Sequence, residues 1–426
     1  MTPEVKHRSA TNGSLVQIRD NDFRVHSSVY TDPEVFELEM RAIFEGSWIY
    51  LAHENEIPQP GDFRTGRMGR QPIIITRGED DSINVLINSC RHRANAVCRE
   101  ERGNAMSFRC PYHAWVYTNK GQLIGVADRP RYSEDFDAAE YSLVKVPRVD
   151  SYRGLIFASL SEDVPSLSEH LGMAKKYIDL WADKNLEGGP IVPRPHRYGY
   201  EGNWKFQAEN GVDGYHPGIV HESAFAAFAA SGIRAFADRR PIDSEHVTRG
   251  FPGGHCTLEG APESGRGTAK SLPEEHNDYI ARLVAAHGEE RARDITANRH
   301  LFIFPNMFLF DDLIRVIQPI SPEKTEVYSN TFTLGGVSPE FNARRFYEAQ
   351  RQLSTSGLVN PSDLEMFASN QTGLQGGRME WLLLSRGMDR EKVLVTGERN
   401  GVYSDEVPQR SFYRHWAQTM NQTVGA

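Results

Sequence analysis

The first regular pattern along the chain is helical. Apolar residues between positions 36 and 44 recur with a helical period and give one apolar face. The stretch from Thr31 to Glu34, Thr-Asp-Pro-Glu, has the form of a capping box with Glu34 at the third helical position. We therefore expect a helix that begins at Thr31, within an N-terminal helical segment of residues 1–47.

From about Trp48 the pattern changes to short β-rich runs between turn signals. Asn119-Lys120-Gly121 is typical of a hairpin turn. The runs that we predict as strands are residues 72–75, 83–88, 115–118 and 154–159. Residues 48–165 are therefore predicted to form a small antiparallel β domain.

Residues 166–426 mix helical and strand patterns and are predicted to form a second domain. Helices are expected at 171–181, 341–354 and 363–375, and paired strands at 301–310 and 313–320 around Asp311-Asp312. A Gly/Pro-rich linker is expected at 188–190, and the polar segment 234–270, rich in Gly and Pro, as a lid or entrance loop. The fold class that follows is α+β.

Composition and charge narrow the function classes. With 426 residues the chain is long enough for two packed domains, and its net charge of −9 gives no electrostatic footprint for nucleic acid or an anionic membrane. The most apolar stretches are too short to span a membrane, and the first 20 residues lack the apolar region of a secretory signal. Four cysteines are too few for a disulfide framework, so we expect a reducing cytoplasm.

The first candidate for chemistry is a set of two Cys–His pairs. Cys90 and His92 form one pair, Cys110 and His113 the other, with residues 93–109 between them. Two thiolates and two imidazoles could hold a tetrahedral zinc ion, or the pattern could be coincidental. A Rieske [2Fe–2S] cluster needs two Cys on one iron and two His on the other, from two loops of a β domain. The spacing and the β context favour the Rieske cluster, a one-electron carrier, with zinc as the alternative.

The second candidate lies in residues 203–221. Asp213 and His216 are three apart, so on a helix they share a face, and the carboxylate can orient the imidazole. His216 and His221 are five apart, with Pro217 between them to distort the backbone, so both rings could face one metal. Two surface histidines near a helix end are the alternative. Two His and one carboxylate on Fe(II) would leave open positions for O₂ and substrate.

Both sets resemble those of the aromatic-ring-hydroxylating oxygenases, in the large subunit. The matching residues are the cluster motif followed by Trp115, then Asn203-Trp204-Lys205, Glu209-Asn210 and Asp213. Many members have Gly where this chain has Ala94 and Ala114. The spacing Glu-Asn-Gly-x-Asp-Gly-Tyr-His is more similar to the benzoate, anthranilate and cumate branch than to the naphthalene branch.

The resemblance implies roles for individual residues. His216 and His221 become iron ligands, and Asp363, in the late acidic segment 360–365, becomes the third. The alternative for Asp363 is an ordinary acid in the first turn of a helix capped by Asn360, with Glu365 as the reserve ligand. Asp213 matches the carboxylate that bridges a cluster histidine of one subunit to an iron histidine of the next.

The resemblance also implies the fold, cofactors and partners. The Rieske domain becomes a β-sandwich, and residues 166–426 a catalytic domain with a curved antiparallel sheet, against which residues 1–47 pack. We expect a [2Fe–2S] cluster, a mononuclear Fe(II), and electrons from NADH through a separate reductase, with or without a ferredoxin. The assembly would be a homotrimer, or α3β3 with a small subunit.

The expected reaction is dioxygenation of a small aromatic substrate, with an aromatic acid as the narrower expectation. Pocket walls are expected from Val212, Ile219, Phe225 and the strand at 301–310. A monooxygenase or demethylase that uses the same iron site is the main alternative. A Rieske electron carrier is a further alternative, although it would need only the first set of ligands.

Overall fold

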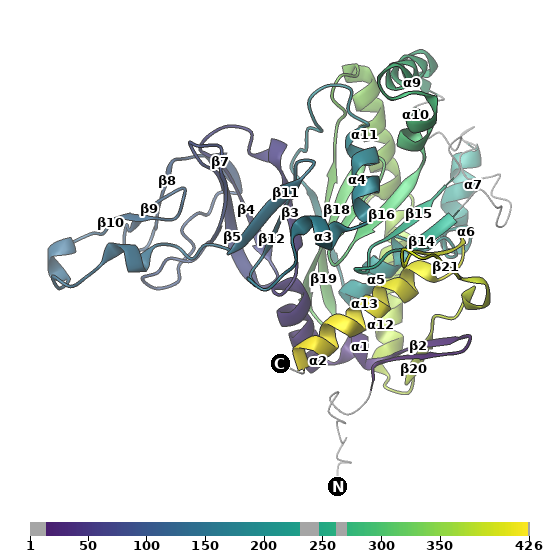
Figure 1. Ribbon diagram of the computed structural model, residues 1–426, viewed down its shortest axis with the longest axis horizontal. Coiled ribbons are helices and arrows are strands. Elements are labelled where there is room, and N and C mark those ends of the chain that lie inside the picture. Colours follow the sequence, from purple (N-terminus) through teal and green to yellow (C-terminus); the bar gives the residue numbers. More distant parts are fainter. Residues whose placement is uncertain (1–13, 231–246, 261–270, 425–426) are drawn as a thin grey trace, which may run out of the picture. The chain divides into compact units, whose positions relative to one another are not determined.

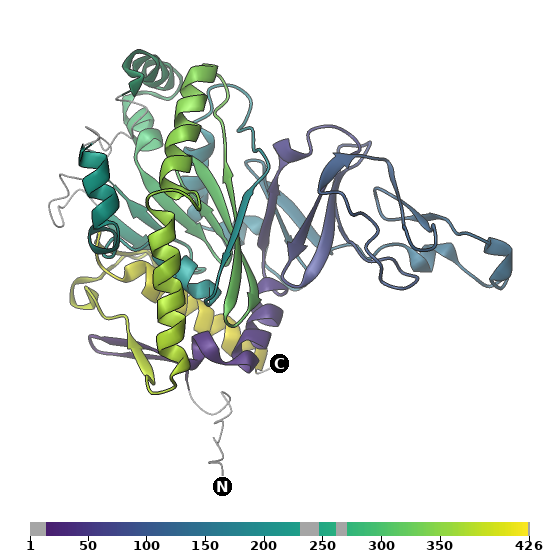
Figure 2. The ribbon, with the colours of Figure 1, turned by 180° about the vertical axis from the view of Figure 1, so that it is seen from behind.

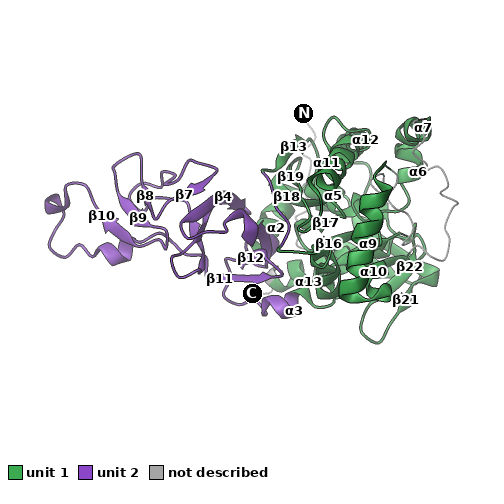
Figure 3. Cartoon of the chain, turned by 90° about the horizontal axis from the view of Figure 1, so that it is seen from above, with its two compact units in different colours: residues 1–42, 171–188, 194–426 green, residues 43–170, 189–193 purple. Residues whose placement is uncertain are grey.

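The computed structural model describes residues 14–230, 247–260 and 271–424. The chain divides into two compact units (Figure 3). Unit 1 holds residues 1–42, 171–188 and 194–426, and unit 2 holds residues 43–170 and 189–193. The domain limits expected at 47/48 and 165/166 stay a prediction, and the units differ from them by a few residues.

Unit 2 is built from three antiparallel sheets (Figure 1). The sheet orders are β6-β5-β4-β7, β11-β12-β3 and β10-β9-β8. Their strands are β3 (Ile49–His53), β4 (Asp62–Met68), β5 (Gln71–Arg77), β6 (Ile83–Ile87), β7 (Arg102–Asn104), β8 (Ser107–Arg109), β9 (Val116–Thr118), β10 (Leu123–Gly125), β11 (Arg148–Tyr152) and β12 (Leu155–Ser159). The four strands predicted from the sequence fall on β5, β6, β9 and β12, and residues 119–121 turn between β9 and β10.

The core of unit 2 holds together the two loops that carry the Cys–His pairs. Phe63, Ile74 and Leu86 are buried against Trp115 and Tyr117, in one cluster that also contains the loop cysteines. Because Trp115 and Tyr117 come directly after the second loop, burial of β9 positions that loop from its C-terminal side.

Unit 1 is organised around an antiparallel sheet of nine strands, in the order β13-β19-β18-β17-β16-β15-β14-β22-β21. The strands are β13 (His196–Tyr200), β14 (Val247–Gly250), β15 (Cys256–Glu259), β16 (Arg299–Ile303), β17 (Met307–Leu309), β18 (Leu313–Ser321), β19 (Lys324–Thr331), β21 (Lys392–Val393) and β22 (Arg399–Val402). The helices of unit 1 that follow the N-terminal segment are α4 (Ala174–Ala182), α5 (Trp204–Asn210), α6 (Pro217–Val220), α7 (Glu222–Ala230), α9 (Pro273–His287), α10 (Glu289–Thr296), α11 (Pro339–Leu353), α12 (Asn360–Gln375) and α13 (Val407–Val424). Helix α3 (Leu167–Leu171) belongs to unit 2 except for its last residue. Helices α11 and α12 cross in front of the sheet in Figure 2. The α+β class is confirmed.

The N-terminal segment folds into unit 1. A small sheet joins β1 (Val16–Arg19), β2 (Asp22–His26) and β20 (Trp381–Leu383), and α1 (Ser28–Thr31) and α2 (Pro33–Glu39) follow. Glu39 forms a 2.6 Å ion pair with Lys205, and both side chains are fully buried. The indole N–H groups of Trp204 and Trp416 also donate to this carboxylate. This carboxylate therefore ties α2 to α5 and α13.

Three local predictions were wrong in detail. Thr31 ends α1, and Asp32 caps α2 by accepting from the backbone N–H of Glu34. The predicted helix 171–181 is split between α3 and α4 at Gly172, whose φ is +45°. The predicted strand 301–310 is two strands, since Pro305, which has no N–H to donate, lies between β16 and β17.

The segment 234–270, predicted as an irregular loop, contains a regular hairpin where the structure describes it. Residues 247–250 and 256–259 pair as β14 and β15. The rest of that segment lies outside the described residues. No described helix is both long and apolar enough to cross a membrane.

Candidate metal centres and active site

The two Cys–His loops of unit 2 close with the same backbone pattern. In the first loop the N–H of Ala94 donates to the carbonyl of Cys90 at 2.8 Å, and the N–H of Cys90 donates to the carbonyl of Asn95 at 2.9 Å. In the second, the N–H of Ala114 donates to the carbonyl of Cys110 at 3.0 Å. Each loop therefore presents its cysteine and histidine from one tight turn.

Ala94 and Ala114 close these turns with left-handed backbone conformations, φ +56° and +58°. Glycine is the residue that adopts this region without a steric cost. The preference of many family members for Gly at these positions is thus a backbone requirement, which this chain meets with the smallest side chain that has a Cβ.

The side chains of the two loops gather by type. His92 and His113 face each other with their Nδ1 atoms 3.1 Å apart. Cys90 Sγ lies 3.2 Å from the Tyr117 hydroxyl, and Cys90 and Cys110 are both buried. Sulfur atoms for one iron and nitrogen atoms for the other are what a [2Fe–2S] cluster requires.

The electrostatics of these side chains suit metal binding. Burial alone would raise the pKa of the Cys110 thiol, but hydrogen bonds from the backbone of Tyr112 and His113 outweigh it and lower that pKa. Burial, followed by the charges of His113 and Arg93, lowers the pKa of His92. Thiolate and neutral imidazole are the forms that bind metals.

A single zinc ion fits this set less well. One zinc would draw all four ligand atoms together around one point. In the part of the chain that the structure describes, the only Cys, His, Asp and Glu ligand atoms that converge in this way belong to a different group, in unit 1. The donor set of unit 2 therefore fits a binuclear cluster better than one ion.

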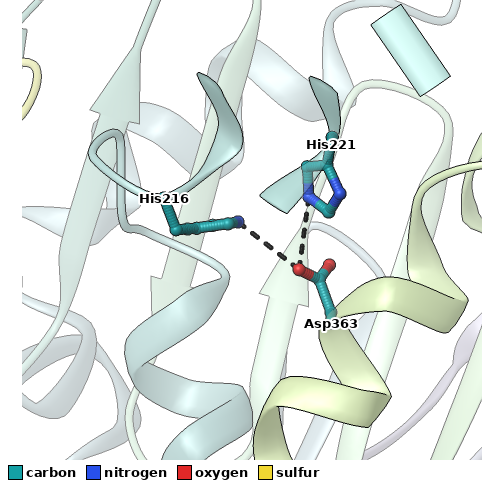
Figure 4. Close-up of side chains that lie close together, drawn as sticks. All are labelled: His216, His221 and Asp363. Carbon is teal, nitrogen blue, oxygen red and sulfur yellow. Dashed lines mark ion pairs between the residues drawn. The ribbon is translucent and has the colours of Figure 1, made fainter. Parts of the chain in front are cut away.

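That converging group is His216, His221 and Asp363, whose ligand atoms all lie within 4.8 Å of one another (Figure 4). Nε2 of His216 is 3.5 Å from Asp363 Oδ1, and Nε2 of His221 is 3.2 Å from the same oxygen. The two histidines flank α6 and the carboxylate lies in the first turn of α12. The structure thus brings together all three residues that the sequence suggested.

The chain between α5 and α6 turns sharply to present His216. Asp213 lies in this turn and not on a helix, so the predicted helical relation to His216 is wrong, although the two side chains still meet. Asp213 Oδ2 is 3.2 Å from His216 Nδ1, without the alignment of a hydrogen bond, and Oδ1 accepts from the N–H of Tyr215. At Gly214 a Cβ would lie 2.1 Å from the carbonyl oxygen of Tyr403, so only glycine fits the turn.

The Ser362 hydroxyl directs the Nε2 lone pair of His221 toward the carboxylate. The Ser362 hydroxyl donates to the carbonyl of Val359 at 2.7 Å, so it is free to accept from Nδ1–H of His221, 2.9 Å away. With its proton on Nδ1, His221 offers Nε2 to a metal.

Two further observations refine the site. Asn210, to which we assigned no role from the sequence, places its amide nitrogen 3.2 Å from both Asp363 Oδ1 and His216 Nε2. Glu365 is exposed and lies outside the group. Val359 precedes α12 and Asn360 is its first residue, so the Asn360 cap that belonged to the alternative interpretation of Asp363 is not formed.

Of the residues expected as pocket walls, Val212 is buried, whereas Ile219 is 69% exposed. Tyr215, beside His216, is also exposed, at 48%. The segment that carries the histidines therefore presents apolar side chains on the surface of this chain.

Comparison with known proteins identifies the family. Residues 47–147 match the Rieske [2Fe-2S] domain, and residues 176–422 match the ring hydroxylating alpha subunit (catalytic domain). The chain belongs to the ring-hydroxylating alpha subunits. It is therefore an oxidoreductase of a family that uses a Rieske cluster and a mononuclear iron.

Several ring-hydroxylating alpha subunits are similar over most of the chain. The toluate 1,2-dioxygenase subunit alpha of Pseudomonas putida is 38% identical over 381 residues, 86% of this chain and 83% of that protein. The anthranilate 1,2-dioxygenase large subunit of Acinetobacter baylyi is 35% identical and covers 87% of this chain and 82% of its own. A naphthalene 1,2-dioxygenase structure with indole in the active site superposes with a TM-score of 0.84 at 26% identity, over 96% of this chain and 94% of that one.

These comparisons confirm the family, the fold class and the benzoate/anthranilate branch predicted from the sequence. They also exclude the simple electron carrier, because the catalytic match adds a second domain to the Rieske domain.

Proposed function

We propose that this chain is the large subunit of a dioxygenase that adds both atoms of O₂ to a small aromatic acid. The observation that carries the proposal is the convergence of His216, His221 and Asp363 in a chain that also presents a Rieske donor set. The aromatic acid is supported by the relatives in the comparison, whose names specify toluate and anthranilate.

The proposed cofactor ligands follow from the donor sets. Cys90 and Cys110 would bind one iron of the cluster, and His92 and His113 the other. His216, His221 and Asp363 would hold the mononuclear iron. When bound, the mononuclear iron supplies O₂ activation, and the cluster supplies electrons one at a time.

The residues of the chain orient these groups. The Ser362 hydroxyl holds the imidazole of His221 from its Nδ1 side, and the Asp213 carboxylate lies 3.2 Å from Nδ1 of His216. Asn210 contacts both His216 and Asp363, and so limits their movement when a ligand binds. Such support around metal ligands sets their direction and affinity.

Asp213 is proposed to connect His216 with the cluster of a neighbouring subunit. Its side chain retains 27% exposure, and the exposed Tyr215 and Ile219 lie in the same segment, so another chain can approach it. This arrangement would require a homotrimer, or an α3β3 assembly with a small subunit. Electrons would come from NADH through a reductase, with or without a ferredoxin.

The proposed location is the cytoplasm. All four cysteines are free and buried, as expected for a protein in a reducing compartment.

Metal content and turnover test the proposal together. Anaerobically prepared protein should contain roughly three iron and two sulfide per chain, from the two ligand sets. With NADH and a reductase, benzoate should give a cis-dihydrodiol. Stoichiometric zinc without sulfide, or hydroxylation that leaves the ring aromatic, would contradict it. The second outcome would favour a monooxygenase or demethylase.

A further inference from the structure

Arg315 on β18 is a buried cation without an anionic partner. Arg315 is 3% exposed, and its Nε and Nη2 atoms have no hydrogen-bond partner. It forms no ion pair with any residue that the structure describes. The guanidinium lies over the Phe310 ring, 5.1 Å from the ring centroid. Buried arginines are almost always paired, because an uncompensated charge in the interior is costly.

The register of the sheet places Arg315 on the face next to the iron ligands. Arg315 pairs directly with Phe308 on β17 and with Ser329 on β19, so these side chains share one face. The Phe308 ring packs so closely under Gly211 that a Cβ there would lie 2.4 Å from it. Gly211 ends α5 and leads directly into the turn that presents His216. The face of Arg315 is therefore the face that the histidine segment covers.

Tyr198 links Arg315 to the carboxylate side of the same site. Its hydroxyl is 3.4 Å from Asn360 Oδ1, at the start of the helix that carries Asp363. Burial raises the pKa of Tyr198, while the charge of Arg315 lowers it and the charge of Asp363 raises it. Arg315 and Asp363 thus both lie within electrostatic range of one phenol.

Other buried polar groups in these elements are also unpaired. The Nδ2 atom of Asn360 and both amide atoms of Gln207 lack hydrogen-bond partners, and the two residues are 1% exposed. Gln207 is on α5 and Asn360 on α12, the two helices that supply Asn210 and Asp363. Buried polar atoms are normally satisfied, so a group of unpaired atoms indicates a polar ligand.

The apolar side chains on this face are aromatic. Phe308 and Phe310 stack with centroids 5.3 Å apart, and His300 meets Phe310 edge-on at 4.6 Å. His300 Nδ1 is 2.9 Å from the carbonyl oxygen of Gly211, which fixes its ring beside the end of α5. Aromatic rings next to a free guanidinium suit a ligand with an aromatic ring and an anionic group.

We propose that Arg315 binds the carboxylate of the aromatic acid substrate. The guanidinium offers two parallel N–H donors that match a carboxylate. The proposal rests on the proposed function for the reaction, but it concerns binding and can be tested without turnover.

The test compares benzoate with benzamide, its uncharged analogue of similar shape, by equilibrium binding to the anaerobic holoenzyme. Wild type should prefer benzoate by tenfold or more. In Arg315→Met, benzoate affinity should fall by roughly 10- to 100-fold, the range for losing hydrogen bonds to a charged group. Benzamide affinity should change less than about threefold. Arg315→Lys should keep part of the preference, since a charge remains without the planar fork.

Thermal unfolding separates substrate binding from a structural role. Because an unpaired buried charge opposes folding, Arg315→Met should unfold at the same or a higher temperature than wild type without ligand. Arg345 is the matched control, since it lies over the Phe332 ring at 5.3 Å but also donates to the carbonyls of Phe332 and Asp311. Arg345→Met should lower the unfolding temperature and leave the benzoate preference intact.

The outcomes distinguish this proposal from the proposed function. A lower unfolding temperature for Arg315→Met with unchanged benzoate affinity would make Arg315 structural and overturn the proposal. The dioxygenase assignment would stand in that case. Loss of benzoate binding in Arg315→Met with an intact cluster spectrum would support the role of Arg315 in substrate binding, whatever product the enzyme forms. A wild type that does not distinguish benzoate from benzamide would also overturn it.

Discussion

At the residue scale, Ala94 and Ala114 have strained backbone conformations that the sequence alone does not reveal. Each lies one or two residues after a histidine of the proposed cluster, within a tight turn, and both have positive φ. An L-residue with a Cβ is less stable by about 1–2 kcal/mol in this region than glycine. The two turns are therefore under steric strain at the places where their cysteines and histidines must be held.

The first prediction is that glycine at these positions stabilises the Rieske domain. Ala94→Gly and Ala114→Gly should each raise the free energy of unfolding by about 0.5–1 kcal/mol, because part of the gain is lost to the greater freedom of glycine in the unfolded chain. Thermal bleaching of the cluster absorbance would measure this. Ala96→Gly, at an exposed position without positive φ, is the control and should be neutral or destabilising.

The second prediction separates Asp363 from Glu365. Asp363→Ala should lose the mononuclear iron and at least about a thousandfold in turnover, since a facial triad would lack its carboxylate, while the cluster spectrum is retained. Glu365→Ala removes an exposed acid on the same helix and should behave as wild type. Iron analysis and turnover of both variants would check this. A normal iron content in Asp363→Ala would refute the ligand assignment.

The residues of the candidate site differ in how far the sequence predicted them. His216 and His221 were suggested by their residue types and local spacing, whereas Asp363 was assigned through the resemblance of segment 360–365 to the family's late acidic segment. Asn210 and Arg315 were not predicted, because their importance depends on what distant segments place beside them. Arg315 differs from an ordinary arginine only through its burial without a partner.

At the element scale, α5 connects the proposed iron site to the N-terminal and C-terminal helices. Glu209, the residue before Asn210, accepts hydrogen bonds from Tyr30 of α1 at 2.8 Å and from Tyr413 of α13 at 2.6 Å. Burial raises the pKa of Glu209 to about 7, even though the two phenols act in the opposite direction. A group that titrates near neutral pH therefore lies where three helices meet.

The third prediction follows from this carboxyl. Because its pKa is higher in the folded chain than the ordinary value of 4.5, its contribution to stability is complete below pH 4.5 and is lost as the pH rises through 7. The loss should be roughly 3 kcal/mol of unfolding free energy. Glu209→Gln should flatten the dependence of the unfolding temperature on pH over this window. An unchanged slope in the variant would show that other groups cause it.

The presence of helices and strands was predicted better than the residues at which they begin and end. The strands β5, β6, β9 and β12 and the helices α11 and α12 follow from periodicity. The break at Gly172 and the turn before β17 could not be located, because a continuous apolar run does not show where the chain reverses. Similarly, Thr31 and Asp32 are both residue types that favour a helix N-cap, and only the backbone conformation in the structure shows that Asp32 caps α2.

At the scale of the whole molecule, the chain combines an electron-accepting unit with an oxygen-activating unit. The proposed link between subunits is Asp213, whose carboxylate lies 3.2 Å from His216 and is partly exposed. The sequence suggested this bridging role for Asp213 only through the resemblance to the family, because a contact with another subunit leaves no periodic pattern in the sequence.

The fourth prediction tests this link. Asp213→Asn should keep the cluster and the iron, because it changes neither ligand set, but should slow electron delivery by about two orders of magnitude or more, as expected for loss of a group around metal ligands. Stopped-flow absorbance should then show reduced cluster persisting after benzoate and O₂ are added. Rapid reoxidation in the variant would show that electrons reach the iron without this carboxylate.

The central claim, that both atoms of O₂ enter one aromatic acid, is tested most directly by turnover of benzoate under ¹⁸O₂ with mass analysis of the product. The proposed iron site predicts two labelled oxygen atoms on adjacent ring carbons, because a facial triad leaves neighbouring open positions on one side of the metal. A single labelled atom in the product would contradict the account and make the enzyme a monooxygenase.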